Sequence, residues 1–108
     1  MVKNTYKHPM ILDLGYKKYK IIQEDMADED AYGYTDLATD IIAIHPDQTP
    51  ANYKGTLLHE ILHVGYEFMG LGSDVLPKIG NEYLVTTTTG MLQLLEGLNK
   101  KLFKFIFS

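Results

Sequence analysis

The hydrophobic pattern of the chain changes near residue 50, and this change constrains the fold more than any other feature. Before residue 50, short stretches rich in Ile and Tyr are bounded by Gly and acidic residues, a pattern typical of β-strands. After it, apolar residues recur every three or four positions, which is typical of amphipathic helices. Strands followed by helices predict an α+β fold with a short, mostly antiparallel N-terminal sheet packed on the helices. A chain of 108 residues suffices for one core, so we expect residues 1–108 to form a single domain.

The first half of the chain contains four strand-like segments. Residues 10–14 and 16–23 indicate two short strands or one interrupted strand. Residues 31–35 and 40–45 flank the short polar connection Asp36-Leu37-Ala38-Thr39, a spacing that predicts a β-hairpin.

The second half of the chain is predicted to be helical. Thr49-Pro50 is a typical helix start, because threonine can cap free amides and proline loses no needed donor at the first helical position. We expect a helix over about 50–69 that ends at Gly70, and, after a loop, a second helix over about 78–97. Residues 98–108 alternate lysine with apolar residues and predict a short closing helix.

The first predicted helix contains the pattern H-E-x-x-H, formed by His59, Glu60 and His63. Residues four apart lie on one helix face about 6 Å apart along the axis, so the two imidazoles can converge on one zinc ion. The apolar stripe of this helix centres on Ile61 and Phe68, and the histidines lie roughly opposite. The helix can therefore pack with one face and present zinc ligands on the other, with Glu60 as general base.

A catalytic zinc ion usually has three protein ligands and a water molecule, so a third ligand is expected downstream. The longer metzincin motif is excluded, because Met69 stands where its third histidine would be. Four acidic residues remain as candidates: Glu67, Asp74, Glu82 and Glu96. We favour Glu82, because the apolar stripe of the second helix, near Leu84, Met91 and Leu95, leaves it on the other side.

Composition narrows the function classes. The chain has no cysteine, so disulfides, thiolate ligands and cysteine nucleophiles are excluded. Ten Lys and Arg residues against fourteen Asp and Glu residues give a formal charge of −4, which disfavours nucleic-acid binding. The absence of an apolar stretch of about 20 residues, and of a signal-peptide pattern, predicts a cytoplasmic protein that does not bind membranes. The acidic run 24–30 is interpreted as a solvated loop, with a basic substrate or partner as the alternative.

The motif segment 56–64, followed by an acidic residue at the start of a second helix in 81–85, resembles a known family. It looks like the minimal gluzincin-type zincin domain of ImmA/IrrE-like peptidases and of small phage-encoded HExxH proteins. The hairpin over 33–44 ahead of the motif helix is similar in layout to those phage proteins.

This resemblance implies a zinc ion held by His59, His63 and Glu82, with catalysis by Glu60. It also implies a protein or peptide substrate, and a location in the host cytoplasm if the chain is phage-encoded. The strand near 40–45 would lie beside the cleft, where it could pair with an extended peptide.

We therefore expect a zinc-dependent metallopeptidase that hydrolyses peptide bonds with a zinc-activated water and a glutamate base. Tyr83, Tyr66 and His45 are candidates for stabilising the oxyanion, and the sequence does not choose among them. The alternative is a non-catalytic domain in which the same zinc stabilises a surface for protein interaction or regulation. A metal-free interaction module is the third hypothesis. The sequence carries no signal for an oligomeric state.

Overall fold

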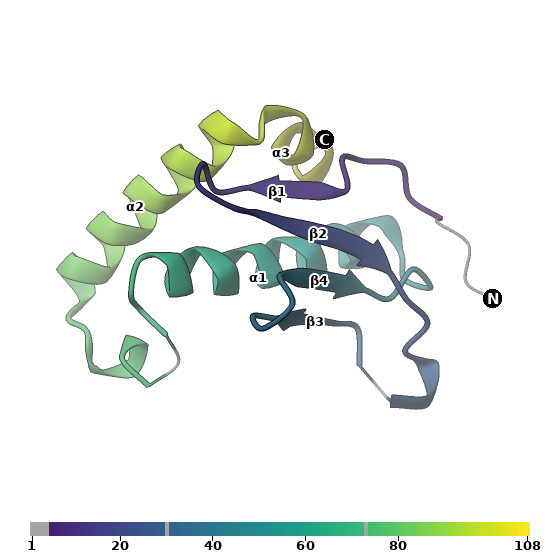
Figure 1. Cartoon of the computed structure of the whole chain (residues 1–108), viewed down its shortest axis with the longest axis horizontal. Helices are drawn as coiled ribbons and strands as arrows, with labels where there is room; N and C mark the ends of the chain where they lie inside the picture. Colours follow the sequence, from purple (N-terminus) through teal and green to yellow (C-terminus); the bar gives the residue numbers. More distant parts are fainter. Residues whose placement is uncertain (1–4, 30, 73) are drawn as a thin grey trace.

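The computed structural model describes residues 5–29, 31–72 and 74–108. It contains a four-stranded sheet and three α-helices, so the expected α+β fold class is confirmed (Figure 1). The strands are β1 (Ile11–Asp13), β2 (Lys18–Gln23), β3 (Gly33–Asp36) and β4 (Ile41–Ile44). The helices are α1 (Pro50–Phe68), α2 (Asn81–Leu98) and α3 (Lys100–Ile106), with short 3-10 turns at Ala27–Glu29 and Leu76–Lys78.

The sheet has the strand order β1-β2-β4-β3. The outer pairs β1–β2 and β3–β4 are antiparallel, as the predicted hairpin requires, whereas the central pair β2–β4 is parallel. Because β4 is paired on both sides, the expectation that the strand near 40–45 lies open for an extended peptide is wrong. Within the described residues, β3 is the strand at that edge of the sheet, next to β4.

Helix α1 begins and ends where its sequence indicates. The side chain of Thr49 accepts a hydrogen bond from the backbone N–H of Asn52 at 3.3 Å, and Pro50 occupies the first turn. After the last helical residue the chain turns away through Gly70, whose φ of 77° is readily adopted only by glycine. The buried face of α1 carries four large core side chains, Tyr53, Leu57, Ile61 and Val64.

Helix α2 starts three residues later than predicted, because Leu76–Lys78 forms a separate 3-10 turn and Gly80 is extended. Of its described residues only Met91 and Leu95 are buried, both in the C-terminal half. Met91 lies against Gly65 of α1, where an added Cβ would be 2.5 Å from the Met91 Sδ atom. Gly65 therefore lets the two helices approach closely.

The segment before β1 also packs on α1. The ring of Tyr6 stacks on Tyr53 with centroids 4.1 Å apart, and His8 Nε2 lies 2.7 Å from the Tyr53 hydroxyl. Burial raises the pKa of Tyr53 and lowers the pKa of His8 from its ordinary value of 6.5. In the part of the chain that the structure describes, no helix is long and apolar enough to cross a membrane.

Candidate metal centre

The two motif histidines converge on the exposed face of α1. Their Nε2 atoms lie 3.1 Å apart, and their rings are nearly perpendicular with centroids at 4.7 Å. Two nitrogens bound to one tetrahedral zinc at about 2.0–2.1 Å would be about 3.3 Å apart. The side chains of His59 and His63 therefore already approach the separation that a shared metal ion requires.

Glu60 lies between the histidines in sequence but turns toward the sheet. Only 8% of its surface is exposed, although it is a carboxylate. The hydroxyl of Thr35, on β3, donates a hydrogen bond of 2.8 Å to Glu60 Oε1. A charged acceptor makes this bond stronger than one between neutral groups, so Thr35 holds one carboxylate oxygen in place. Sequence reasoning missed Thr35, because no local pattern relates a strand residue to a helix residue 25 positions away.

The edge strand β3 runs alongside this carboxylate. An added Cβ at Gly33 would lie 2.8 Å from the Thr56 side chain, so glycine is needed for the strand to approach α1. The N–H of His45 donates to the carbonyl of Tyr32 at 2.8 Å, and the register pairs Gly33 with Ile44. Hydrogen bonding alternates along an antiparallel pair, so the backbone groups of residues 33 and 35 point toward the outer edge of the sheet.

Two hollows of about 560 Å³ each meet at Glu60, which lines both. The His59 hollow has mainly small and polar walls, including Gly33, Gln48 and Asn52. The His63 hollow has more apolar walls, formed by Leu37, Leu71, Leu76 and Pro77 together with Tyr34, Thr35, Tyr66, Glu67 and Gly72. The candidate centre therefore lies between a polar and a largely apolar depression.

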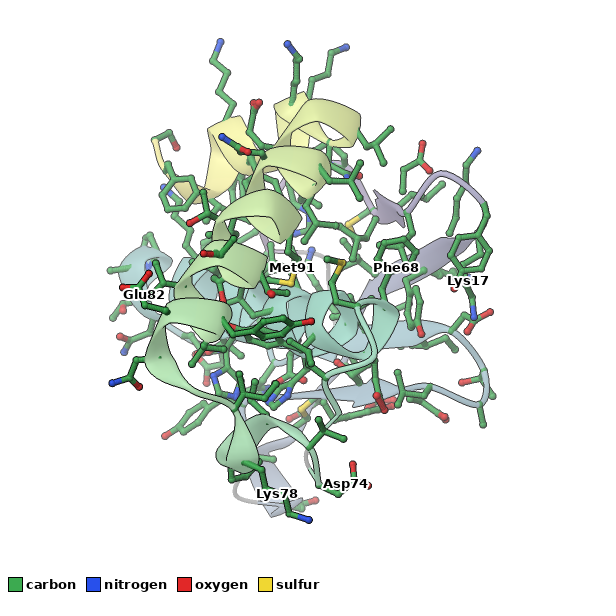
Figure 2. The ribbon with its side chains drawn as sticks, turned by 90° about the vertical axis from the view of Figure 1, so that its left-hand side faces the viewer. Lys17, Phe68, Asp74, Lys78, Glu82 and Met91 are labelled. Atoms are coloured by element: carbon green, nitrogen blue, oxygen red, sulfur yellow. The ribbon has the colours of Figure 1, made fainter. Side chains whose placement is uncertain are left out.

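The structure does not bring a third ligand to the histidine pair. Among the described residues, no three His, Asp or Glu side chains are grouped so that they could hold a metal. Glu82 is exposed on the first turn of α2, and Figure 2 shows it and Asp74 at separate places on the surface. Glu96 is exposed near the other end of α2, and Glu67 lines the His63 hollow. The assignment of Glu82 as a ligand stays a prediction.

The three oxyanion candidates are placed very differently. The hydroxyl of Tyr66 lies 2.8 Å from Thr88 Oγ1, and Tyr66 lines the His63 hollow together with Glu60. Tyr83 is 63% exposed on α2. His45 is only 6% exposed, and its Nδ1 atom accepts the N–H of Met26 at 3.1 Å, which is a structural role. Of the three, Tyr66 is the one that lines a hollow with Glu60.

We compared the chain with protein-family models, with curated proteins and with solved structures, and these comparisons found no match.

Proposed function

We propose that this protein is a zinc-dependent peptidase in which His59 and His63 hold the metal and Glu60 is the general base. The observation that carries the proposal is the convergence of the two imidazoles, with Nε2 atoms 3.1 Å apart, beside a largely buried carboxylate. Paired histidines with an adjacent glutamate on one helix are the ligand and base pattern of zinc peptidases.

The edge of β3 supports a peptide as substrate. The outward backbone groups of Gly33 and Thr35 can hydrogen-bond an extended peptide, which adds a strand to the sheet. The side chain of Thr35 is bonded to Glu60, so a peptide paired at this residue has its backbone next to the carboxylate. Such pairing recognises any extended main chain, and side-chain selectivity must come from the adjoining hollows.

A bound zinc ion would lower the pKa of a coordinated water toward about 7 and polarise the substrate carbonyl. Glu60 accepts the proton of the attacking water and delivers it to the leaving amine as the C–N bond breaks. Thr35 holds Oε1 of Glu60, which leaves the other carboxylate oxygen for the water. The low exposure of Glu60 limits competition from bulk solvent.

Glu82 remains the third ligand that we propose. For Glu82 to bind the same metal ion as the histidines, the first turns of α2 must move toward His59 and His63. The buried anchors of α2, Met91 and Leu95, lie in its C-terminal half, whereas its first two turns have no buried residue. The part of α2 that carries Glu82 is therefore the part with the least packing to resist such a shift.

Zinc content tests the metal site directly. We expect one equivalent of zinc by elemental analysis in wild-type protein purified without a metal-affinity tag. The ion should be lost in His59→Ala and in Glu82→Ala. It should be retained in Glu96→Ala, the control for an exposed acid of α2. Absence of zinc in the wild type, even after reconstitution, would overturn the proposal.

Hydrolysis is tested with a fluorogenic peptide library. Glu60→Gln should keep the zinc and lose turnover, because the amide cannot take the proton from water. Hydrolysis that survives Glu60→Gln would contradict the assigned base. One equivalent of zinc in a wild-type protein that cleaves no peptide would favour the non-catalytic zinc domain.

A further inference from the structure

The His63 hollow combines apolar walls with a carboxylate that has no cationic partner. Glu67 lines this hollow one helical turn beyond His63. Among the described residues, the ion pair between Lys17 and Asp40 lies elsewhere. No lysine or arginine lines the hollow. The acidic side chains of its lining are therefore Glu60 and Glu67, and Glu67 is the one that is neither the proposed base nor a proposed metal ligand.

The carboxylate of Glu67 lies against a glycine in the following loop. An added Cβ at Gly72 would lie 2.8 Å from Glu67 Oε2 and 3.1 Å from Oε1. A side chain at position 72 would displace the carboxylate, so this glycine leaves room for Glu67 beside Leu71 and Leu76 on the hollow's wall.

We propose that the His63 hollow binds a lysine or arginine side chain of the substrate, an inference that rests on the proposed peptidase function. Long basic side chains have an apolar stem and a cationic head. The stem can pack against Leu37, Leu71 and Leu76, while the head reaches Glu67. The volume of about 560 Å³ lies within the usual range of ligand pockets, about 300–1,000 Å³.

The direction of β3 places this basic residue relative to the bond that is cleaved. Along β3 the chain passes from the His59 hollow, lined by Gly33, to the His63 hollow, lined by Tyr34 and Thr35. A peptide paired antiparallel, the more stable arrangement, runs the opposite way. Its residue in the His63 hollow therefore precedes the bond next to Glu60, and cleavage follows a basic residue.

Binding measurements separate this proposal from catalysis. Fluorescent peptides that differ at one position, as lysine, norleucine or glutamate, are titrated by anisotropy into zinc-reconstituted Glu60→Gln protein. We expect lysine to bind about three- to fivefold more tightly than norleucine, as an exposed ion pair allows, and glutamate to bind most weakly. Adding Glu67→Gln should remove the advantage of lysine, whereas adding the matched control Glu96→Gln should keep it. Equal affinity for lysine and norleucine, or an advantage that survives Glu67→Gln, overturns the proposal.

Cleavage mapping by mass spectrometry with the wild type completes the test. Cleavage that follows lysine or arginine supports the proposal. Hydrolysis without this preference overturns it and leaves the peptidase function intact. Conversely, lysine-selective binding that depends on Glu67, without hydrolysis of any peptide, overturns the peptidase function and leaves the basic-residue site. Loss of zinc in Glu67→Gln would identify Glu67 as a metal ligand and would also overturn the proposal.

Discussion

Replacing Gly65 by alanine tests the close approach of α1 and α2, which positions the helix that carries Glu82. An added Cβ would lie 2.5 Å from Met91 Sδ, 3.1 Å from Met91 Cγ and 3.2 Å from Leu95 Cδ1. Overpacking a core at several atoms costs about 1–3 kcal/mol. The higher helix propensity of alanine than of glycine offsets about 1 kcal/mol of this cost. We therefore expect Gly65→Ala to destabilise the protein by up to about 2 kcal/mol.

The same substitution at Gly55 is a matched control. Gly55 lies on the same helix, but nothing lies within 4 Å of its added Cβ. Gly55→Ala should stabilise the protein by up to about 1 kcal/mol, because only the propensity changes. The two alanine variants should thus shift stability in opposite directions.

Urea denaturation followed by circular dichroism measures both effects. With a slope of about 1–2 kcal/mol per molar urea, Gly65→Ala should lower the midpoint by up to about 1–2 M and Gly55→Ala should raise it. A double-mutant cycle with Met91→Ala should show that the cost of Gly65→Ala falls once Met91 is truncated. If both alanine variants raise the midpoint equally, α2 does not pack against Gly65 and the reasoning is refuted.

Three further predictions concern the site, the N-terminal segment and the junction of α2 with α3. Thr35→Val should lower kcat about tenfold with little change in KM, because Glu60 loses a charge-assisted hydrogen bond. Thr35→Ser keeps the hydroxyl and should restore kcat. A fully active valine variant in steady-state kinetics would contradict this role of Thr35. Because burial lowers the pKa of His8 below 6.5, the unfolded chain binds its proton more readily. Stability measured by urea denaturation should therefore fall as the pH drops through 6.5, and less so in His8→Gln; parallel pH profiles would exclude this role. Asn99→Ala should lower the free energy of unfolding by about 2–4 kcal/mol, because the buried side-chain amide of Asn99 makes hydrogen bonds to backbone groups of Asp13 and Leu95. An unchanged urea midpoint would argue against this role of Asn99.

The motif helix was predictable because its information is local. Thr49, Pro50 and Gly70 mark its ends, and the period of its apolar residues shows which face is buried. The spacing of His59 and His63 by one helical turn then places both imidazoles on one side, as the structure has them. Each of these signals acts within a few residues along the chain.

The partners of Glu60 and the identity of the open strand were not predictable in this way. The family resemblance implied that the strand over 40–45 lies open beside the cleft, but that strand is β4, which pairs with β2 and β3. A strand's apolar pattern shows whether it is buried and not which neighbours it takes. The edge position of β3 therefore could not be derived from its residues alone.

What the sequence alone determined is the α+β class, the approximate positions of the strands and helices, and the pair of imidazoles on one helix face. Tertiary structure decided that Thr35 reaches Glu60, that Gly65 admits Met91, and that Glu82 lies apart from the histidines. Periodicity and capping are short-range properties that a single segment reveals. The contacts around the site depend on strand order and helix packing, which the free energy of the whole core selects.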